Sequence, residues 1–228
     1  MVAPPVRLPG GDGVLYLAMA LGQGSLLLAD GREFFVARYV DWSITTPMLL
    51  AGLCLTALHS PLRRWALMLG ILFTDVNMIA TGVIAGFSPV GSAAKWTWFL
   101  ISSGAFAFIY VGLWGPMRGE AVKTGPKTAA LYTRNASILS ALWLAYPVIF
   151  LLGNEGTNAI SPVATAALYT SFDVISKVVF GIISLRGTQT KTTEELREGS
   201  IPEHDLRPAP RAYHEVHRAG VSEASASD

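Results

Sequence analysis

The sequence predicts an all-α membrane protein, a bundle of transmembrane helices, from three observations. Of the 228 residues, 51% are hydrophobic and only 14% are charged, whereas soluble domains carry about 25% charged residues. Among the 17 Lys and Arg and 16 Asp and Glu residues, 13 lie after residue 186. Apolar runs of membrane length recur before that point. The composition excludes an ordinary soluble globule and a nucleic-acid-binding protein, and a single cysteine excludes a disulfide framework and a cysteine-based metal cluster.

Six apolar runs, separated by short breaks rich in Gly, Pro and charge, are expected to span the membrane. We predict these spans at residues 14–29, 34–58, 65–87, 96–115, 131–153 and 159–185. Five of them reach the length of about 20 helical residues that a bilayer core requires, and the first is marginal. A β-barrel is the weaker alternative, because its strands would alternate apolar and polar residues, whereas a run such as Ala66–Phe73 is continuously apolar.

The chain is predicted to have three parts. Residues 1–13 form an irregular start rich in Pro and Gly, residues 14–186 form the membrane domain, and residues 187–228 form a polar tail. The tail is expected to be disordered, because it carries many charges and few large apolar residues.

Loop charges predict the orientation of the chain in the cell membrane. Basic residues concentrate in the breaks at 59–64 and 116–134 and directly after the last span, whereas the opposite side carries only Arg32 and Lys95. The breaks with the greater basic charge, and the C-terminus, are therefore expected to be cytoplasmic.

Ionisable residues inside membrane spans are rare and usually functional. Apart from Arg134, which belongs to the basic break at 116–134, the predicted spans contain five: Arg38, Asp41, Asp75, Asp173 and Lys177. Arg38 and Asp41 are three residues apart, and Asp173 and Lys177 are four apart, so each pair shares a helix face. A lysine in the membrane interior needs a carboxylate partner. We therefore predict one buried cluster in which Lys177 faces both Asp41 and Asp173, with Arg38 on its outer side.

Two interpretations of this cluster are open from the charged residues alone. One is a structural ion pair that locks two helices, and the other is a reactive lysine that forms a Schiff base with an aldehyde. Aromatic residues favour the second. Trp143 precedes Tyr146 by three residues, so both rings lie near one helix face and could wall a long planar ligand. Pro147 would kink that helix and free a carbonyl.

Several motifs, in order from about Leu15 to Arg186, resemble the microbial rhodopsins of the bacteriorhodopsin and proteorhodopsin type. The segment from Arg38 to Pro47 resembles that family's third helix, Trp143–Pro147 its sixth, and Phe172–Gly181 its seventh, with the retinal-binding lysine at Lys177. Asp75–Met78 resembles the fourth helix, Trp98 the fifth, and Tyr16–Gly22 the end of the second. The family has seven helices; the sequence offers six, with no counterpart of the first before Val14.

The resemblance implies an all-trans retinal bound as a Schiff base to Lys177, without enzymatic activity. Asp41 matches the family's primary proton acceptor, Asp173 its second counterion, and Arg38 the residue that gates proton release. Thr45 lies one turn beyond Asp41, so its hydroxyl is expected to hydrogen-bond that carboxylate and tune it.

Further positions are assigned by the same resemblance. Glu155 matches one carboxylate of the family's outer release pair, although the partner position is Thr165, and a solvated loop acid is an equal alternative. Asp75 is expected to be a hydrogen-bonded acid between helices near the retinal ring. The other residues expected to contact retinal are Trp42, Thr46, Met78, Trp98, Trp143, Tyr146, Pro147 and Tyr16.

The implied activity is light-driven outward proton transport. In pumps of this family, a carboxylate 11 residues after the acceptor, about 16 Å along the helix, reprotonates the Schiff base. Here that residue is Gly52, so the proton is expected from cytoplasmic water or another group. The triad Asp41, Thr45 and Gly52 resembles a subgroup of bacterial proton-pumping rhodopsins. A photosensory rhodopsin and a truncated, non-functional rhodopsin are the alternatives, and a homo-oligomer, a trimer or pentamer, is implied by analogy.

Overall fold

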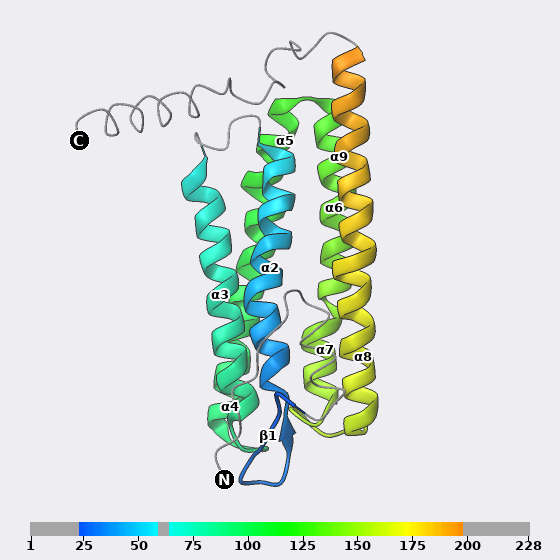
Figure 1. The fold of residues 1–228 in the computed structure, drawn as a ribbon. Helices are drawn as coiled ribbons and strands as arrows, with labels where there is room; N and C mark the ends of the chain where they lie inside the picture. The colour runs from blue at the N-terminus through cyan, green and yellow to red at the C-terminus, as the bar shows by residue number, and fades with distance from the viewer. Residues whose placement is uncertain (1–22, 59–63, 198–228) are drawn as a thin grey trace, which may run out of the picture. The chain divides into compact units, whose positions relative to one another are not determined.

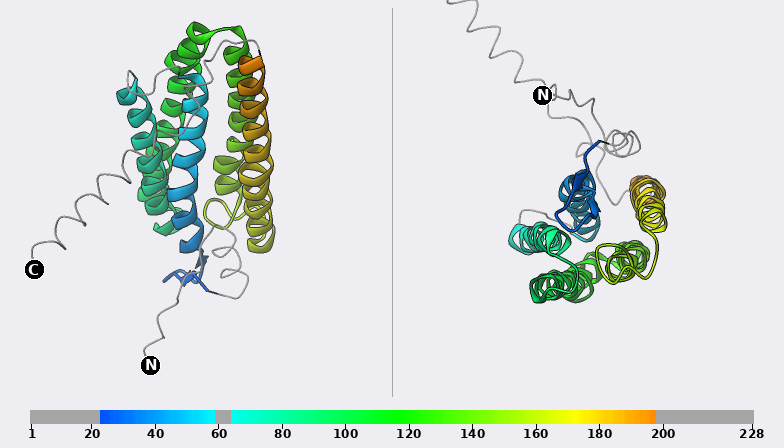
Figure 2. Two further views of the ribbon diagram at one scale, coloured as in Figure 1. Left: turned by 45° about the horizontal axis from the view of Figure 1, so that its top comes forward. Right: turned by 90° about the horizontal axis from the view of Figure 1, so that it is seen from below.

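The computed structural model describes residues 23–58 and 64–197. In chain order the elements are β1 (Leu26–Leu27), β2 (Glu33–Phe34), α2 (Val36–Ala57), α3 (Trp65–Phe87), α4 (Ala93–Gly112), the π-helix η2 (Leu113–Met117), α5 (Arg118–Thr124), α6 (Pro126–Trp143), α7 (Ala145–Leu152), α8 (Pro162–Val174), the π-helix η3 (Ile175–Val179) and α9 (Phe180–Arg197). The helices run side by side as a bundle (Figure 1). Viewed end-on, they follow one another in chain order, and α2 packs against both α3 and α6 (Figure 2).

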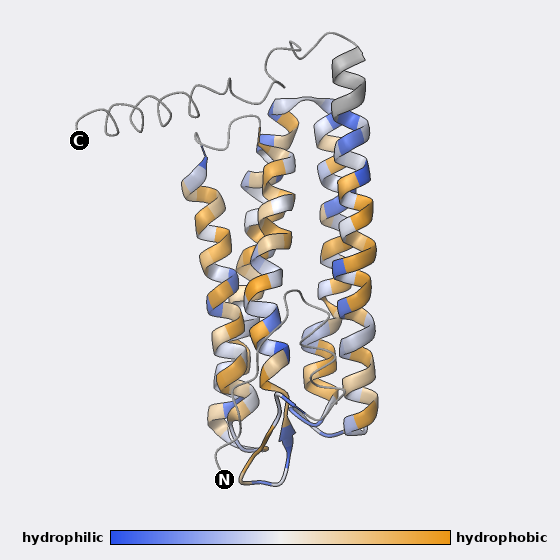
Figure 3. Cartoon of the chain, viewed as in Figure 1, coloured by the Kyte–Doolittle hydropathy of each residue, from blue (hydrophilic) through white to orange (hydrophobic). Residues whose placement is uncertain are grey.

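Five helical stretches in the described part of the chain are long and apolar enough to cross a membrane, which confirms the predicted fold class. They are Val36–Ala57, Trp65–Phe87, Ala93–Thr124, Pro126–Leu152 and Pro162–Lys191. Only 17% of the apolar window of α3 and 11% of that of α4–α5 is buried within the protein. Hydrophobic residues predominate along these helices (Figure 3). An apolar helix surface that the protein itself leaves uncovered is suited to contact lipid.

The first predicted span, 14–29, is not helical where the structure describes it. Residues 14–22 lie outside the described residues, and residues 23–29 lead into a two-stranded antiparallel hairpin of β1 and β2. The hairpin turns at Asp30 and Gly31, where Gly31 has φ +79° and its N–H donates to the carbonyl of Leu28 at 2.9 Å. An Asp-Gly pair favours such a turn, so the local chemistry ends any helix before this point.

Two predicted helix boundaries are also corrected. The fourth span was expected to end near Gly115 and Pro116, but the chain stays helical to Thr124 because the π-helix η2 accommodates the proline. Proline has no N–H to donate, and its ring clashes with the carbonyl four residues earlier in a regular α-helix. The wider turn of a π-bulge changes the local hydrogen-bond pattern, so the helix continues past Pro116. The last helix runs to Arg197, beyond the predicted start of the polar tail at 187. The rest of that tail, and the irregular start 1–13, lie outside the described residues.

The break expected at Pro147 is present. Helix α6 ends at Trp143 and α7 begins at Ala145, so the interruption falls three to four residues before the proline. Because Pro147 has no N–H, it cannot donate to the carbonyl of Trp143, four residues earlier. This break separates the two aromatic residues Trp143 and Tyr146 along the helix.

The helices pack through two apolar clusters. The first joins α2, α3, α4, η2 and α6 through residues such as Leu50, Ile109, Met117 and Tyr132. The second surrounds Trp42 and Tyr169 near the hairpin. In the first cluster, the fully buried Tyr132 on α6 donates its hydroxyl to the carbonyl of Leu113 in η2, at 2.8 Å. This bond ties the π-bulge to the neighbouring helix.

We expect Tyr132→Phe to lower the free energy of unfolding by about 1 kcal/mol, because the Leu113 carbonyl loses a buried donor. Unfolding in detergent, followed by circular dichroism, measures the change. The control is Thr170→Val, which removes an exposed hydroxyl bonded only within its own helix. Equal stability of the two variants would show that the bond does not tie the helices.

Candidate functional site

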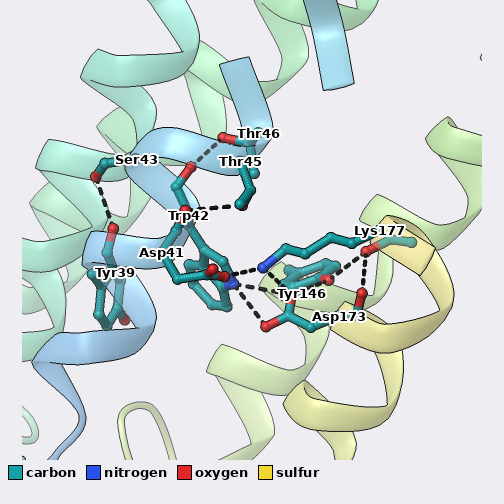
Figure 4. A network of polar contacts seen from close by, with 10 residues as sticks. Tyr39, Asp41, Trp42, Ser43, Thr45, Thr46, Tyr146, Asp173 and Lys177 are labelled. Atoms are coloured by element: carbon teal, nitrogen blue, oxygen red, sulfur yellow. Dashed lines mark hydrogen bonds and ion pairs between the residues drawn. The ribbon is translucent and has the colours of Figure 1, made fainter. Parts of the chain in front are cut away.

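A buried ion cluster lies between α2 and the segment formed by α8 and η3 (Figure 4). Nζ of Lys177 donates to Oδ2 of Asp41 and lies 3.5 Å from Oδ1 of Asp173. The Asp41 and Asp173 side chains are 0% and 2% exposed, and that of Lys177 is 12% exposed. The structure thus brings together the three residues that the sequence predicted to meet. Lys177 lies at the centre of η3, and π-bulges are frequent at functional sites.

Aromatic side chains hold the Asp173 carboxylate in position. Nε1 of Trp42 lies 3.0 Å from each of its oxygens, and the hydroxyl of Tyr146 donates to Oδ1 at 2.6 Å. Tyr146 also lies 3.1 Å from Oγ of Ser176, one residue before Lys177. Because these donors come from α2 and α7, the position of Asp173 depends on three separate elements.

Thr45 and Thr46 of α2 are hydrogen-bonded to different partners. The hydroxyl of Thr45 donates to the backbone carbonyl of Asp41 at 2.9 Å. The predicted bond from Thr45 to the Asp41 carboxylate is therefore corrected, because the helical i−4 carbonyl is the nearer acceptor. The hydroxyl of Thr46 lies 2.7 Å from Oδ2 of Asp75 on α3. Asp75 is thus an acid hydrogen-bonded between two helices, as the sequence predicted.

A second buried cluster lies around Glu155, in the loop between α7 and α8. Nη1 of Arg38 lies 3.2 Å from Oε1 of Glu155, and the hydroxyl of Tyr39 donates to Oε2 at 2.6 Å. Glu155 is only 2% exposed, so the alternative of a solvated loop acid is wrong. Thr165 donates its hydroxyl to the carbonyl of Ser161 at 3.0 Å. The Arg38 guanidinium stacks over the ring of Tyr169, 4.2 Å from its centre.

An apolar cavity adjoins the ion cluster and shares Trp42 and Tyr146 with it. Its lining comes from α2, α3, α4, α6, α7 and α8: Tyr39, Trp42, Thr46, Met78, Ile79, Gly82, Phe99, Ser102, Ser103, Phe106, Trp143, Tyr146, Pro147, Phe150 and Tyr169. The volume of this cavity is about 100 Å³.

The structure places six predicted ligand contacts in this lining: Trp42, Thr46, Met78, Trp143, Tyr146 and Pro147. Trp98 is not among them; it is half-buried, and Phe99 takes its place. Tyr16 lies outside the described residues. The α4 residues Phe99, Ser102, Ser103 and Phe106 were not predicted. Their spacing of three, four and seven residues marks one helix face, and this periodicity was the available signal.

The family model described as bacteriorhodopsin-like protein matches residues 6–191. The chain belongs to the bacteriorhodopsin-like family. Bacteriorhodopsin of Haloterrigena sp. (strain arg-4) is 37% identical over 176 residues, covering 75% of this chain and 68% of that protein. Archaerhodopsin-2 of Halobacterium sp. (strain aus-2) is 33% identical over 185 residues, covering 79% of this chain and 70% of that protein.

Solved structures agree with the family assignment. The crystal structure of thermophilic rhodopsin from Rubrobacter xylanophilus has 39% sequence identity and a TM-score of 0.74, covering 77% of this chain and 76% of that chain. The light-driven proton pump Coccomyxa subellipsoidea rhodopsin has 34% identity and a TM-score of 0.69, covering 75% of each chain. This chain is therefore a multi-pass membrane rhodopsin homologous to light-driven proton pumps, and its family comprises light-driven transporters rather than enzymes.

The family implies retinal as the chromophore, and the residues present fit it. A retinal attached at Nζ of Lys177 needs an elongated apolar space next to that atom, and the cavity begins at Trp42 and Tyr146 of the ion cluster. Its aromatic walls suit a planar polyene. Asp41 and Asp173 supply the negative charge that a cation at Nζ requires.

Replacing Lys177 by Met in the protein prepared without retinal should lower the free energy of unfolding by about 3–5 kcal/mol, because two buried carboxylates lose their cation. Adding Asp41→Asn should recover part of the loss. Detergent unfolding followed by circular dichroism measures both effects.

The control for this experiment is Lys123→Met. Lys123 pairs with Glu120 at 2.8 Å but its side chain is 67% exposed, so about 1 kcal/mol or less is expected. A loss for Lys177→Met no larger than the control's would contradict the assignment of a buried ion cluster.

Proposed function

We propose that this rhodopsin is a light-driven outward proton pump that carries all-trans retinal on Lys177 and has no carboxylate donor on α2. The observation that carries the proposal is the contact of Nζ of Lys177 with the buried Asp41 carboxylate, beside an aromatic cavity. Its support from the comparisons is homology to proteins described as light-driven proton pumps.

Asp41 is the proton acceptor in this proposal. When bound, a retinal condensed with Nζ of Lys177 supplies light absorption and a light-driven change of shape that moves the Nζ proton. Asp41 is hydrogen-bonded to that nitrogen in the resting geometry, so transfer needs no large displacement of the protein.

Asp173 acts as the fixed counterion. Trp42 and Tyr146 hold its carboxylate from two other elements, and its Oδ1 is 3.5 Å from Nζ. A carboxylate so positioned stabilises positive charge at Lys177 while Asp41 changes its protonation. Asp41 therefore accepts the proton, and Asp173 remains ionised as the counterion.

The outward route runs from Asp41 to Glu155 by way of Arg38. Arg38 is three residues before Asp41 on α2 and pairs with Glu155 at 3.2 Å. In this proposal Glu155 carries a proton before illumination. Protonation of Asp41 removes a negative charge near Arg38, so Arg38 attracts Glu155 more strongly, and the Glu155 proton passes to the medium and leaves a carboxylate paired with Arg38. Glu155 releases the proton without a second carboxylate, because the position of the second acid in the family's release pair is occupied by Thr165.

The proton returns to Nζ of Lys177 from the cytoplasm. Gly52, which lies 11 residues after Asp41 on the same helix, offers no carboxylate. Gly52 is exposed on the surface of α2, and an added Cβ would meet no atom within 4 Å. We place the hairpin and the 153–161 loop outside the cell, and the 59–64 break, the α5–α6 region and the C-terminus in the cytoplasm, because the basic residues favour that orientation. The proposal extends by analogy to a homo-oligomer, a trimer or pentamer.

The test is illumination of unbuffered cells that express the full chain with all-trans retinal. A pump acidifies the medium, and a protonophore abolishes the signal. Lys177→Ala should give neither colour nor acidification, because it removes the attachment nitrogen. Colour without acidification in the unaltered chain would favour a photosensory rhodopsin, and absence of colour would favour a non-functional chain.

Asp41→Asn should abolish acidification and shift the absorption maximum to longer wavelength, because it removes the acceptor and one negative charge at Nζ. Light-driven pH changes and the visible spectrum of the purified pigment measure the two effects. Glu120→Gln is the control, since this acid pairs with Arg64 and Lys123 at the far end of the bundle. Persistent transport by Asp41→Asn would overturn the acceptor assignment.

Recovery of the Nζ proton should slow with rising pH, by about tenfold per pH unit when the proton comes from bulk water rather than from an internal group. Gly52→Asp should make recovery faster and nearly independent of pH, since it supplies an internal donor in open space. Flash photolysis between pH 6 and pH 9 measures both. A rate that does not change with pH in the unaltered chain would contradict the absence of an internal donor.

A further inference from the structure

Lys95, near the start of α4, is a fully buried lysine that the transport route does not use. It is 0% exposed. Its Nζ donates to the carbonyl of Ala85 at 2.8 Å and to the carbonyl of Glu155 at 2.6 Å. The ring of Phe150 covers the ammonium at 5.6 Å. The lysine therefore links the end of α3 to the same loop residue whose carboxylate faces Arg38.

Arg32, in the hairpin turn, makes a parallel link. Its Nη2 donates to the carbonyl of Ser88 at 2.9 Å, and its Nη1 lies 3.3 Å from that of Gly86 and 3.5 Å from that of Asn154. The charge is balanced by Asp30 at 2.7 Å. Both cations that the sequence assigned to the outer loops thus turn inward and join α3 to consecutive residues of the α7–α8 loop.

The end of α3 explains why cations lie here. The last carbonyls of a helix have no partner within it, and they form the negative end of the helix dipole. Ala85 and Gly86 belong to the last turn of α3, which ends at Phe87. The buried ammonium of Lys95 donates to the helix-end carbonyl of Ala85 and to the loop carbonyl of Glu155, so its N–H groups have backbone partners.

Glu155 is consequently held from two sides. Its carboxylate is bound by Arg38 and Tyr39 on α2, and its backbone carbonyl is bound by Lys95 on α4. The loop residue has no regular helix or strand of its own to set its position, since α7 ends at Leu152 and α8 begins at Pro162. The Lys95 bond restrains the backbone from which the carboxylate projects.

We propose that Lys95 is a positioning residue of the proton-release site, which fixes the backbone of Glu155 so that its carboxylate stays in register with Arg38 and Tyr39. The inference rests on the proposed role of Glu155 in release. Lys95 transfers no proton; it acts through the position of Glu155. Displacement of a reacting group by about 1 Å slows transfer severely, so a change at Lys95 should appear in the timing of release.

The test uses the full chain reconstituted with all-trans retinal, and Lys95→Met, Lys95→Arg and Glu155→Gln. After a flash, a pH-indicator dye reports when a proton reaches the medium, and infrared absorption of carboxyl groups reports when Asp41 is protonated. Lys95→Met should delay release about tenfold while leaving the colour and the rate of Asp41 protonation unchanged. Lys95→Arg keeps the charge and the donors and should stay within about twofold of the unaltered pigment.

Combination with Glu155→Gln separates positioning from general structural damage. In the Glu155→Gln background, Lys95→Met should cause no further delay, because the group that it positions is already lost. Lys123→Met, at an exposed lysine, is the control and should leave the timing unchanged. A further delay of the same size in the double variant would overturn the proposal.

Slow release in Glu155→Gln with normal release in Lys95→Met would overturn the role of Lys95 alone. Normal release in Glu155→Gln would overturn the proposed role of Glu155, and the role of Lys95 with it. If Lys95→Met forms no pigment, Lys95→Arg decides: timing like that of the unaltered pigment supports the proposal, and a tenfold delay overturns it.

Discussion

The contact of one buried ammonium with two buried carboxylates is the constraint on which the rest of the structure depends. Lys177, Asp41 and Asp173 lie where the bundle is otherwise apolar and aromatic. Isolated charges in such surroundings are strongly unfavourable, and paired, hydrogen-bonded charges are tolerated. The helices that contribute these side chains must therefore stay in one relative position, and Trp42 and Tyr146 add the hydrogen bonds that hold it.

Helix α2 organises the polar interior because its faces meet three different partners. Asp41 faces Lys177, Thr46 reaches Asp75 on α3, and Arg38 reaches Glu155 in the α7–α8 loop. Each contact joins α2 to another segment of the chain. Because Asp41, Thr46 and Arg38 lie on the same helix, their positions relative to one another are fixed by that helix. This arrangement connects the ion cluster at Lys177 with the loop that carries Glu155.

At the end of the bundle that carries the hairpin, two cations bind backbone carbonyls of separate segments. Lys95 and Arg32 compensate the carbonyls at the end of α3 and reach the loop that holds Glu155. A loop between two helices gains a defined position in this way, although it forms no regular structure. The same geometry explains why Glu155 is buried while it lies outside the helices.

The pattern of apolar runs by itself predicted six spans in a helical bundle, because a segment crossing lipid must be apolar over its whole length and must satisfy its backbone internally. Five of these spans are present in the described part of the chain. The rarity of charge inside those runs identified Lys177, Asp41 and Asp173 as partners, and the order of motifs identified the family. A hairpin replaces the end of the helix predicted up to residue 29, and the Asp30-Gly31 pair in the sequence was a signal for its turn. The helix continues through Pro116 because of a π-bulge, which no local sequence pattern specifies.

Only the tertiary structure decided which side chains face the cavity and which partners the outer residues take. Trp98 and Phe99 are neighbours in sequence, and the rotation of α4 against its neighbours places Phe99 in the lining. Thr45 found its acceptor in its own helix, and Lys95 bound two carbonyls from segments 10 and 60 residues away. Such choices depend on how packed helices are turned and on backbone groups that every residue carries alike, so residue identity alone does not encode them.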